Sequence, residues 1–267
     1  MRVHVVIDES GFFLPSYLEH VTRYLPEGLE ITGVTVLMNP PSVPTVYSHL
    51  RSHRKDIGVP SCMRLGWKVL GHLTRELASM SGLPLRPGSV FRTARSLGLP
   101  VRRVVLVNAL EALRWIASGT PDLVLSSCSQ VFRKELLALP RIGAINRHSS
   151  LLPSYGGILP MFQALNNKEK HVGTSIHVMT PGIDRGVLVA QSAFSVTEEM
   201  TLYDCYERSY SDSGPLTVES LLKIRDLGSA NLDKADFGIR NDLERSYFGL
   251  PTEEDWERFH QAERRFC

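Results

Sequence analysis

The sequence has only four cysteines, and they are scattered along the chain: Cys62, Cys128, Cys205 and Cys267. Four dispersed cysteines fit reduced thiols better than a disulfide framework. The chain also lacks a run of about 18 apolar residues, and its first strand is not preceded by the charged and apolar segments of a secretory signal. We therefore expect a soluble protein of the cytoplasm, without a transmembrane segment.

Metal-binding signatures are also missing, because the sequence contains no H-E-x-x-H motif, no EF-hand loop and no paired C-x-x-C. One alternative is a zinc site made by His148, His177 and Asp184, since two imidazoles and a carboxylate can bind zinc and leave a position open. Their spacing does not favour it, and it leaves Asn146 without a role. We predict no metal.

The hydrophobic pattern predicts an α/β fold. A chain of 267 residues with 43% hydrophobic content can bury one large core. Strands and helices alternate, which is typical of parallel strands joined by helices, and we expect a mostly parallel sheet flanked by helices. The expected strands are 2–7, 30–37, 103–107, 122–127, 143–146 and 175–178, and the expected helices are 14–24, 109–118, 132–138 and 201–222.

Two polar residues follow a predicted buried strand. Asn146 and His148 come just after the apolar run 143–145, and ligands in open α/β sheets bind beyond the carboxyl ends of the strands. Residues two apart in an extended segment point the same way. An amide N–H beside an imidazole suits the stabilisation of an oxyanion on a carbonyl under attack, so the pair indicates acyl transfer.

Asp184 is the candidate carboxylate. It lies between Gly182 and Gly186, which permit a tight turn that could bring it back over the strand ends, although turn formation alone would also explain it. There it would orient the imidazole, raise its pKa and take a proton from an attacking amine. His177 is a neighbour of this site, but a histidine satisfied within a sheet is the simpler interpretation.

The joint pattern is more specific than each motif, since SLLPSYGG (150–157) and VGTSIHVM (172–179) accompany these residues. Residues 121–191 closely resemble the catalytic domain of folate-dependent formyltransferases, which include glycinamide ribonucleotide, methionyl-tRNA and nucleotide-sugar formyltransferases. The resemblance implies a Rossmann-like fold, 10-formyltetrahydrofolate as formyl donor and a catalytic triad of Asn146, His148 and Asp184. It also implies that the pterin contacts two loops. Their residues are Ser127, Cys128, Ser129, Gln130 and Val131 in one loop, and Gly182, Ile183 and Gly186 in the other.

The acceptor has to be inferred from the rest of the chain. The first strand-to-helix connection, residues 8–15, has a single glycine, which argues against a phosphate cradle and so against glycinamide ribonucleotide. Residues 12–18 resemble methionyl-tRNA and sugar formyltransferases, but the sequence stops before the additional RNA-binding domain typical of the tRNA enzyme. We therefore expect the primary amine of a small molecule, most simply an amino sugar or its nucleotide derivative, and regard tRNA as an unlikely partner.

Other functions stay open. They are a methionyl-tRNA formyltransferase without the additional domain, an amino-acid or hydroxylamine formyltransferase of a secondary pathway, a formyltetrahydrofolate hydrolase, and a folate-binding module without turnover. Arg147 and the pair Gly156-Gly157 depart from the residues common in the family, so the acceptor cannot be transferred by analogy.

A basic insertion, residues 51–100, interrupts the predicted catalytic domain of residues 1–225. Between residues 51 and 103 there are eleven Lys or Arg but only two acidic residues. The apolar residues of an amphipathic helix recur there at helical spacing, namely Leu65, Val69, Leu70, Leu73 and Leu77. We expect this helix to pack on the core and to expose a basic face. That face could attract a phosphorylated or nucleotide-linked substrate, an anionic membrane surface or carrier, or RNA by electrostatics alone.

The last segment, residues 226–267, is polar but carries aromatic anchors, which makes a disordered tail less probable than an ordered extension. We predict that it packs on the catalytic domain or forms the interface of a homodimer.

Overall fold

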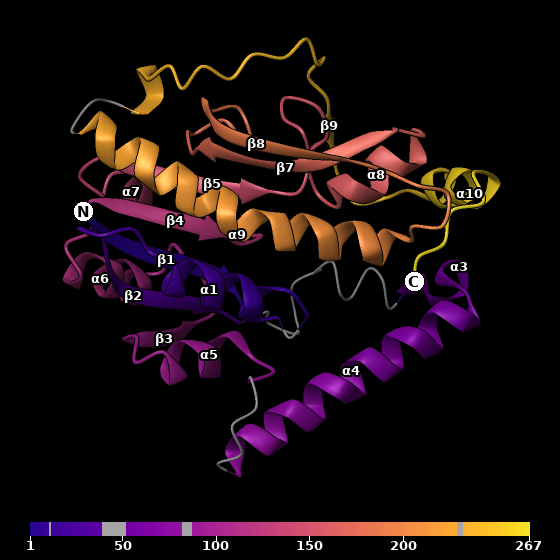
Figure 1. Cartoon of the computed structure of the whole chain (residues 1–267), viewed down its shortest axis with the longest axis horizontal. Coiled ribbons are helices and arrows are strands. Elements are labelled where there is room, and N and C mark those ends of the chain that lie inside the picture. The colour runs from indigo at the N-terminus through magenta and orange to yellow at the C-terminus, as the bar shows by residue number, and fades with distance from the viewer. Residues whose placement is uncertain (11, 39–51, 82–86, 229–231) are drawn as a thin grey trace.

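The protein is described here from a computed structural model, which covers residues 1–10, 12–38, 52–81, 87–228 and 232–267. Its centre is a seven-stranded sheet with helices on both faces (Figure 1). The chain begins with a β-α-β unit made of β1 (Arg2–Asp8), α1 (Leu14–Arg23) and β2 (Glu30–Leu37). Residues 3–7 of β1 are buried on both sides, as expected for a strand inside a covered parallel sheet. Gly11, within the first connection, lies outside the described residues.

The strand order is β3-β2-β1-β4-β5-β7-β8. The first five strands run parallel to one another, whereas β7 and β8 continue the sheet in antiparallel fashion. The strands not yet given are β3 (Val101–Val104), β4 (Leu123–Ser127), β5 (Gly143–His148), β7 (His171–Val178) and β8 (Leu188–Ser195). The order reverses between β1 and β4, which is where open α/β sheets bind ligands. The predicted Rossmann-like, mostly parallel α/β fold is confirmed.

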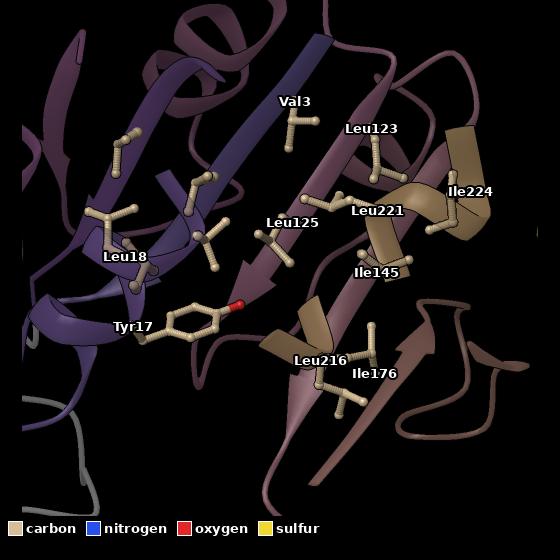
Figure 2. Close-up of a cluster of buried hydrophobic side chains, with 14 of the residues drawn as sticks. Val3, Tyr17, Leu18, Leu123, Leu125, Ile145, Ile176, Leu216, Leu221 and Ile224 are labelled. Atoms are coloured by element: carbon tan, nitrogen blue, oxygen red, sulfur yellow. The ribbon is translucent and has the colours of Figure 1, made fainter. Parts of the chain in front are cut away.

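One face of the sheet is covered by α1, α5 (Val90–Ser96) and α9 (Leu202–Leu227). Val3, Val5 and Ile7 of β1 belong to one core cluster with the apolar side of α1 and α9. Figure 2 shows Val3 in this cluster with labelled residues of both helices. The intervening residues point to the other face, because side chains alternate along a strand. There Val6 packs with residues of α6 (Leu110–Ser118) and α7 (Lys134–Leu137). The sheet therefore has two separate cores.

A third cluster lies at the end of the sheet, where α8 (Pro160–Asn166) meets α10 (Glu253–Gln261) and the start of α9. Trp256 of α10 is 2% exposed and packs against Phe162 and Phe259. Ahead of α10, β9 (Tyr247–Phe248) pairs in parallel with β6 (Gly156–Gly157). Residues of the C-terminal segment thus contact the residues that precede α8.

Several element boundaries differ from the expected ones. β3 spans residues 101–104 rather than 103–107, because its pairing with β2 begins where Val34 N donates to Pro100 O and ends where Met38 N donates to Val104 O. α7 covers four residues, and the buried Phe132 precedes it. α9 runs to residue 227, so the predicted domain boundary after residue 225 falls in its last turn. Residues 229–231 of the predicted extension lie outside the described residues.

The predicted basic insertion contains α3 (Arg54–Ile57), the 22-residue α4 (Val59–Met80) and α5; its residues 51 and 82–86 lie outside the described residues. The expectation that the apolar side of its long helix packs on the core is wrong. Leu65 is half-buried, but four other leucines and valines of that side are 41–64% exposed, namely Val69, Leu70, Leu73 and Leu77. The cause is that α4 contacts the protein mainly through polar side chains.

None of the helices formed by the described residues is both long enough and apolar enough to cross a lipid bilayer.

Candidate active site

Asn146 and His148 lie on the same face of the sheet, at the carboxyl end of β5. They were expected just beyond the strand, but β5 continues to His148 because it also pairs with β7, with Asn146 opposite His177 and His148 opposite Ser175. The regular extended backbone keeps the two polar side chains on one side, as their spacing predicted.

His177 holds the amide of Asn146. Its Nδ1 lies 3.0 Å from the carbonyl oxygen of Val178, and because that oxygen can only accept, Nδ1 carries the proton. Its Nε2 then accepts from Asn146 Nδ2 at 3.3 Å. Burial lowers the pKa of His177 to about 4, so the ring stays neutral near pH 7 and keeps this lone pair. His177 is thus satisfied within the sheet and is also part of the site.

His148 is held between a carbonyl and a carboxylate. Its Nε2 donates to the carbonyl oxygen of Tyr155 at 3.0 Å, and its Nδ1 lies 3.9 Å from Asp184 Oδ2. That second distance is too long for a hydrogen bond, so it is an electrostatic contact. The other oxygen of Asp184 lies 3.5 Å from His177 Nε2. The structure therefore brings Asn146, His148, His177 and Asp184 together.

Asp184 reaches the site because its own backbone is left-handed, with φ of 51°. The two flanking glycines were expected to supply the unusual backbone, but neither has a positive φ. Aspartate tolerates this region better than most residues, since its short side chain can bond locally. Gly186 is needed for another reason, because a side chain there would overlap the carbonyl oxygen of Val178.

The backbone N–H of Gly157 fixes the carboxylate, since it donates to Asp184 Oδ2 at 2.8 Å. Gly157 has φ of 95°, and a Cβ at this position would overlap the carbonyl oxygen of Phe248 in β9. Gly157 is thus needed for β9 to pair so close to Asp184. Arg245, just before β9, also donates to the main-chain oxygen of Asp184 at 3.3 Å.

The first predicted donor loop, Ser127–Val131, follows β4 next to Asn146. The Gln130 side chain braces the loop, because its Oε1 accepts from Val107 N and its Nε2 donates to Val105 O. Burial raises the pKa of Cys128 to about 12, so its thiol stays protonated and is a poor nucleophile. Ser129 N is already bonded to Asp8 Oδ2 at 2.8 Å.

The second predicted donor loop is the turn that carries Asp184. The carbonyl oxygen of Gly182 accepts from the Thr180 hydroxyl at 3.1 Å, which closes the start of the turn. Ile183 is 44% exposed, and Val131 of the first loop is 55% exposed. Each loop therefore presents one branched apolar side chain at its surface.

Asp8 was missed by the sequence analysis, although it ends the first strand. Val6, Ser126 and Asn146 are aligned across β1, β4 and β5, so Asp8, two residues after Val6, lies on the same sheet face as Asn146. Among the described residues, its buried Oδ1 has no hydrogen-bond partner. Burial raises the pKa of Asp8 to about 6. A carboxylate at the switch point of the sheet is a recognisable signal, but the sequence does not show its burial.

We expect Asp8→Asn to stabilise the protein in a pH-dependent way. The folded state holds the Asp8 proton up to about pH 6, whereas the unfolded chain releases it near its usual pKa of 3.8. Stability is therefore lost as the pH rises through this window. The gain in free energy of unfolding should grow from near zero at about pH 4 to about 3 kcal/mol at about pH 7.5. Urea unfolding at both pH values measures it, and an equal difference at both would contradict the burial of the charge.

Arg147, which departs from the family pattern, points away from the site. Its guanidinium donates to the hydroxyls of Ser213 and Ser209, each at 2.8 Å, and lies over the ring of Tyr210 at 3.6 Å. All three partners belong to α9 on the opposite sheet face. Arg147 therefore fastens α9 to β5 and does not contact the triad.

The described residues contain no group of three or more His, Cys, Asp and Glu side chains placed to hold a metal ion. His177, which the zinc alternative requires as a ligand, uses Nδ1 for Val178 and Nε2 for Asn146.

Comparisons with known proteins point to formyltransferases. A family model described as formyl transferase matches residues 103–220. The chain is 30% identical over 173 residues to a methionyl-tRNA formyltransferase of Thermotoga maritima. The aligned segment covers 64% of this chain and 55% of that protein. The chain thus spans about half the length of the curated relatives it matches.

Solved structures share the fold. A phosphoribosylglycinamide formyltransferase from Anaplasma phagocytophilum superposes with a TM-score of 0.62 at 18% identity, over 94% of this chain and 99% of that one. A sugar N-formyltransferase from a Shewanella species gives a TM-score of 0.57 at 19% identity, over 98% and 87%. The matched segment 103–220 includes β4, β5 and the Asp184 turn, so this part of the chain is similar to the formyl transferase family.

Proposed function

We propose that this protein transfers a formyl group from 10-formyltetrahydrofolate to the primary amine of a small molecule. The observation that carries the proposal is the convergence of Asn146, His148 and Asp184 on one face at the carboxyl ends of the strands. This set combines donors for an oxyanion with a carboxylate that can receive a proton.

In the proposed reaction the acceptor amine attacks the formyl carbon. A bond forms between the amine nitrogen and this carbon, and the bond between the carbon and N10 of the folate breaks. Asn146 Nδ2 has two protons and gives one to His177, so the other is free for the formyl oxygen. His148 can contribute its Nε2 proton if the formyl oxygen shares it with Tyr155 O. Asp184 receives the proton that the amine loses, and N10 gains one.

Positioning would supply much of the rate. Direct transfer between two bound molecules needs no nucleophilic side chain, and juxtaposition and oxyanion stabilisation are each worth several kcal/mol in favourable cases. The Asn146 amide is held by its hydrogen bond to His177, and the Asp184 carboxylate is held by the N–H of Gly157. Both side chains are therefore positioned before a ligand binds. Such preorganisation is what lets a few hydrogen bonds lower a barrier.

The two predicted donor loops fit a flat, partly apolar folate. They flank the triad, and the exposed Val131 and Ile183 offer apolar contacts for a ring. The buried Oδ1 of Asn146 has no partner among the described residues, so the site has an unused acceptor next to the reacting groups. These features support the donor assignment to Ser127–Val131 and to Gly182, Ile183 and Gly186.

For the acceptor we propose an amino sugar or its nucleotide derivative. A sugar N-formyltransferase shares this fold over 98% of the chain. Residues 12–18 resemble sugar and methionyl-tRNA formyltransferases alike. A methionyl-tRNA acceptor is the second candidate, because the curated relatives carry that name.

The deciding experiment follows tetrahydrofolate release by the full chain given 10-formyltetrahydrofolate and one candidate acceptor at a time. The acceptors are nucleotide-linked amino sugars, free amino sugars, amino acids and initiator methionyl-tRNA. We expect release only with an amino sugar. If tetrahydrofolate release requires tRNA or an amino acid, that molecule is the acceptor and the amino-sugar proposal is wrong. If release occurs without any amine, the protein is a hydrolase. Donor binding without release in all mixtures overturns the proposed transfer.

A further inference from the structure

The long helix α4 faces the protein with its polar side. Near its start Ser61 and Arg64 donate to the carbonyl oxygen of Cys267 at 3.1 and 3.0 Å. In the middle, Lys68 lies over the ring of Tyr203 at 3.8 Å. These contacts orient the helix about its own axis.

Further along, the same side of α4 continues to contact the protein. His72 meets the edge of Phe12, with ring centroids 4.9 Å apart. Glu76 accepts from Gly88 N and the Ser89 hydroxyl, each at 2.9 Å, and pairs with Arg92 at 2.5 Å. Ser61, Lys68, His72 and Glu76 follow one another at intervals of seven, four and four residues, which places them on one side of a helix.

The opposite side of α4 is apolar and open to solvent. Its side chains follow one another at intervals of three or four residues, so they form a continuous stripe. They are 48–73% exposed, and we call them the outer stripe: Val59, Met63, Trp67, Leu70, Leu73 and Leu77. Figure 1 shows α4 running along the outer edge of the molecule, away from the sheet. An apolar stripe turned outward along a whole helix marks a binding surface.

The outer stripe has a basic border. Arg64, Lys68 and Arg75 lie along one side of it, between the stripe and the protein, and the first two keep their charge while they contact Cys267 O and the ring of Tyr203. The only acidic residue of α4, Glu76, is paired with Arg92, so the border keeps its positive charge. Two more cations, Arg54 and Lys55, are exposed in α3 just before α4. The matching surface is therefore anionic as well as apolar.

The charge beside the outer stripe favours an anionic lipid surface over a second copy of this chain, because two copies facing each other would bring like charges together. The 22-residue helix is about 33 Å long, so the whole stripe can lie flat on a surface. A helix in a membrane interface sinks its apolar side to the level of the acyl chains while its cations contact the headgroups.

We propose that α4 binds the surface of anionic membranes, with the outer stripe inserted and the basic border on the headgroups. This inference does not depend on the proposed formyl transfer, since α4 contributes no residue to the triad. It differs from a membrane span, because the helix lies in the plane of the surface. The protein would then bind the membrane reversibly, with the sheet and its site outside the lipid.

The test is cosedimentation of the full chain with vesicles of phosphatidylcholine alone and of phosphatidylcholine with phosphatidylserine. We expect binding to the anionic vesicles, weakened by salt, with a blue shift of tryptophan fluorescence from Trp67. The double variant Trp67→Gln/Leu70→Gln should bind at least about tenfold more weakly, because each apolar side chain withdrawn from water contributes more than a factor of ten. Both positions are exposed, so the fold should be kept.

A matched control is Val105→Gln/Leu106→Gln, which removes two exposed apolar side chains from the segment after β3. It should bind the anionic vesicles as the parent does. The proposal is overturned if the parent does not bind anionic vesicles, or if both double variants bind alike. It is also overturned if the parent forms a dimer that Trp67→Gln/Leu70→Gln abolishes while vesicle binding is unchanged, since a second copy would then cover the stripe.

Discussion

His148→Ala and Asp184→Asn will each lower the rate of amine-dependent tetrahydrofolate release by at least about a hundredfold, while donor binding is largely kept. His148→Ala removes an N–H donor from the oxyanion. Asp184→Asn removes the negative charge that receives the proton, but its amide oxygen can still accept from Gly157 N, so the turn keeps its position. Single-turnover kinetics together with a donor-binding titration separate the two effects.

His171→Ala is the matched control, because His171 is an exposed histidine at the start of β7. It should retain the turnover of the parent. Turnover at the parent level in both His148→Ala and Asp184→Asn would refute the assignment of the triad, whereas a parallel loss of donor affinity and of thermal stability would point to a structural role.

Trp256→Ala is the substitution expected to cost most stability, about 3–5 kcal/mol in free energy of unfolding. Trp256 is 2% exposed and packs with Phe162 at a centroid distance of 4.8 Å, and with Phe259 and Phe266 at 6.2 Å each. The truncation leaves a cavity where α10 meets α8, and the aromatic rings around it cannot close the gap without leaving their rotamers. Urea unfolding with linear extrapolation measures the loss.

Trp67→Ala is the control for this loss, since Trp67 is 70% exposed on α4. Its effect on the free energy of unfolding should stay within about 0.5 kcal/mol. A loss below about 1 kcal/mol for Trp256→Ala would mean that α10 adds little to the fold, because truncating a buried large side chain normally costs several times more.

The sequence was sufficient to predict most of the sheet and the shared face of Asn146 and His148, because both depend on local patterns. Buried parallel strands are continuous apolar runs, and β2 has the expected bounds. The side chains of Asn146 and His148 share a face because of their spacing alone. Asp184 was a candidate because of its glycine-flanked turn, but no local pattern brings residue 184 to residue 148, and the family resemblance was needed to assign it to the triad.

The predictions that failed or were missed depend on long-range packing. The apolar residues of α4 predicted that this side would face the core. In the structure α4 contacts the rest of the protein through Lys68 and Glu76 instead. Helical periodicity shows which residues share a side, but not which side packs on the protein. The pairing of Gly157 with Phe248 joins residues 91 positions apart. The burial that shifts the pKa of Asp8 likewise arises from β4 and the loop after it.

The pairing of β6 with β9 has a consequence for how the protein is made. During translation Asn146, His148 and Asp184 are made before residues 245–248. Of these later residues, Arg245 donates to the main-chain oxygen of Asp184, and β9 pairs with β6, whose Gly157 binds the Asp184 carboxylate. The parallel strands can form in the order in which they are synthesised. The contacts of Arg245 with Asp184 and of β9 with β6 can form only after residues 245–248 have left the ribosome. The turn that carries Asp184 thus gains its last contacts after residues 245–248 are made, and a translation product truncated before them would fold its sheet while leaving this carboxylate less constrained.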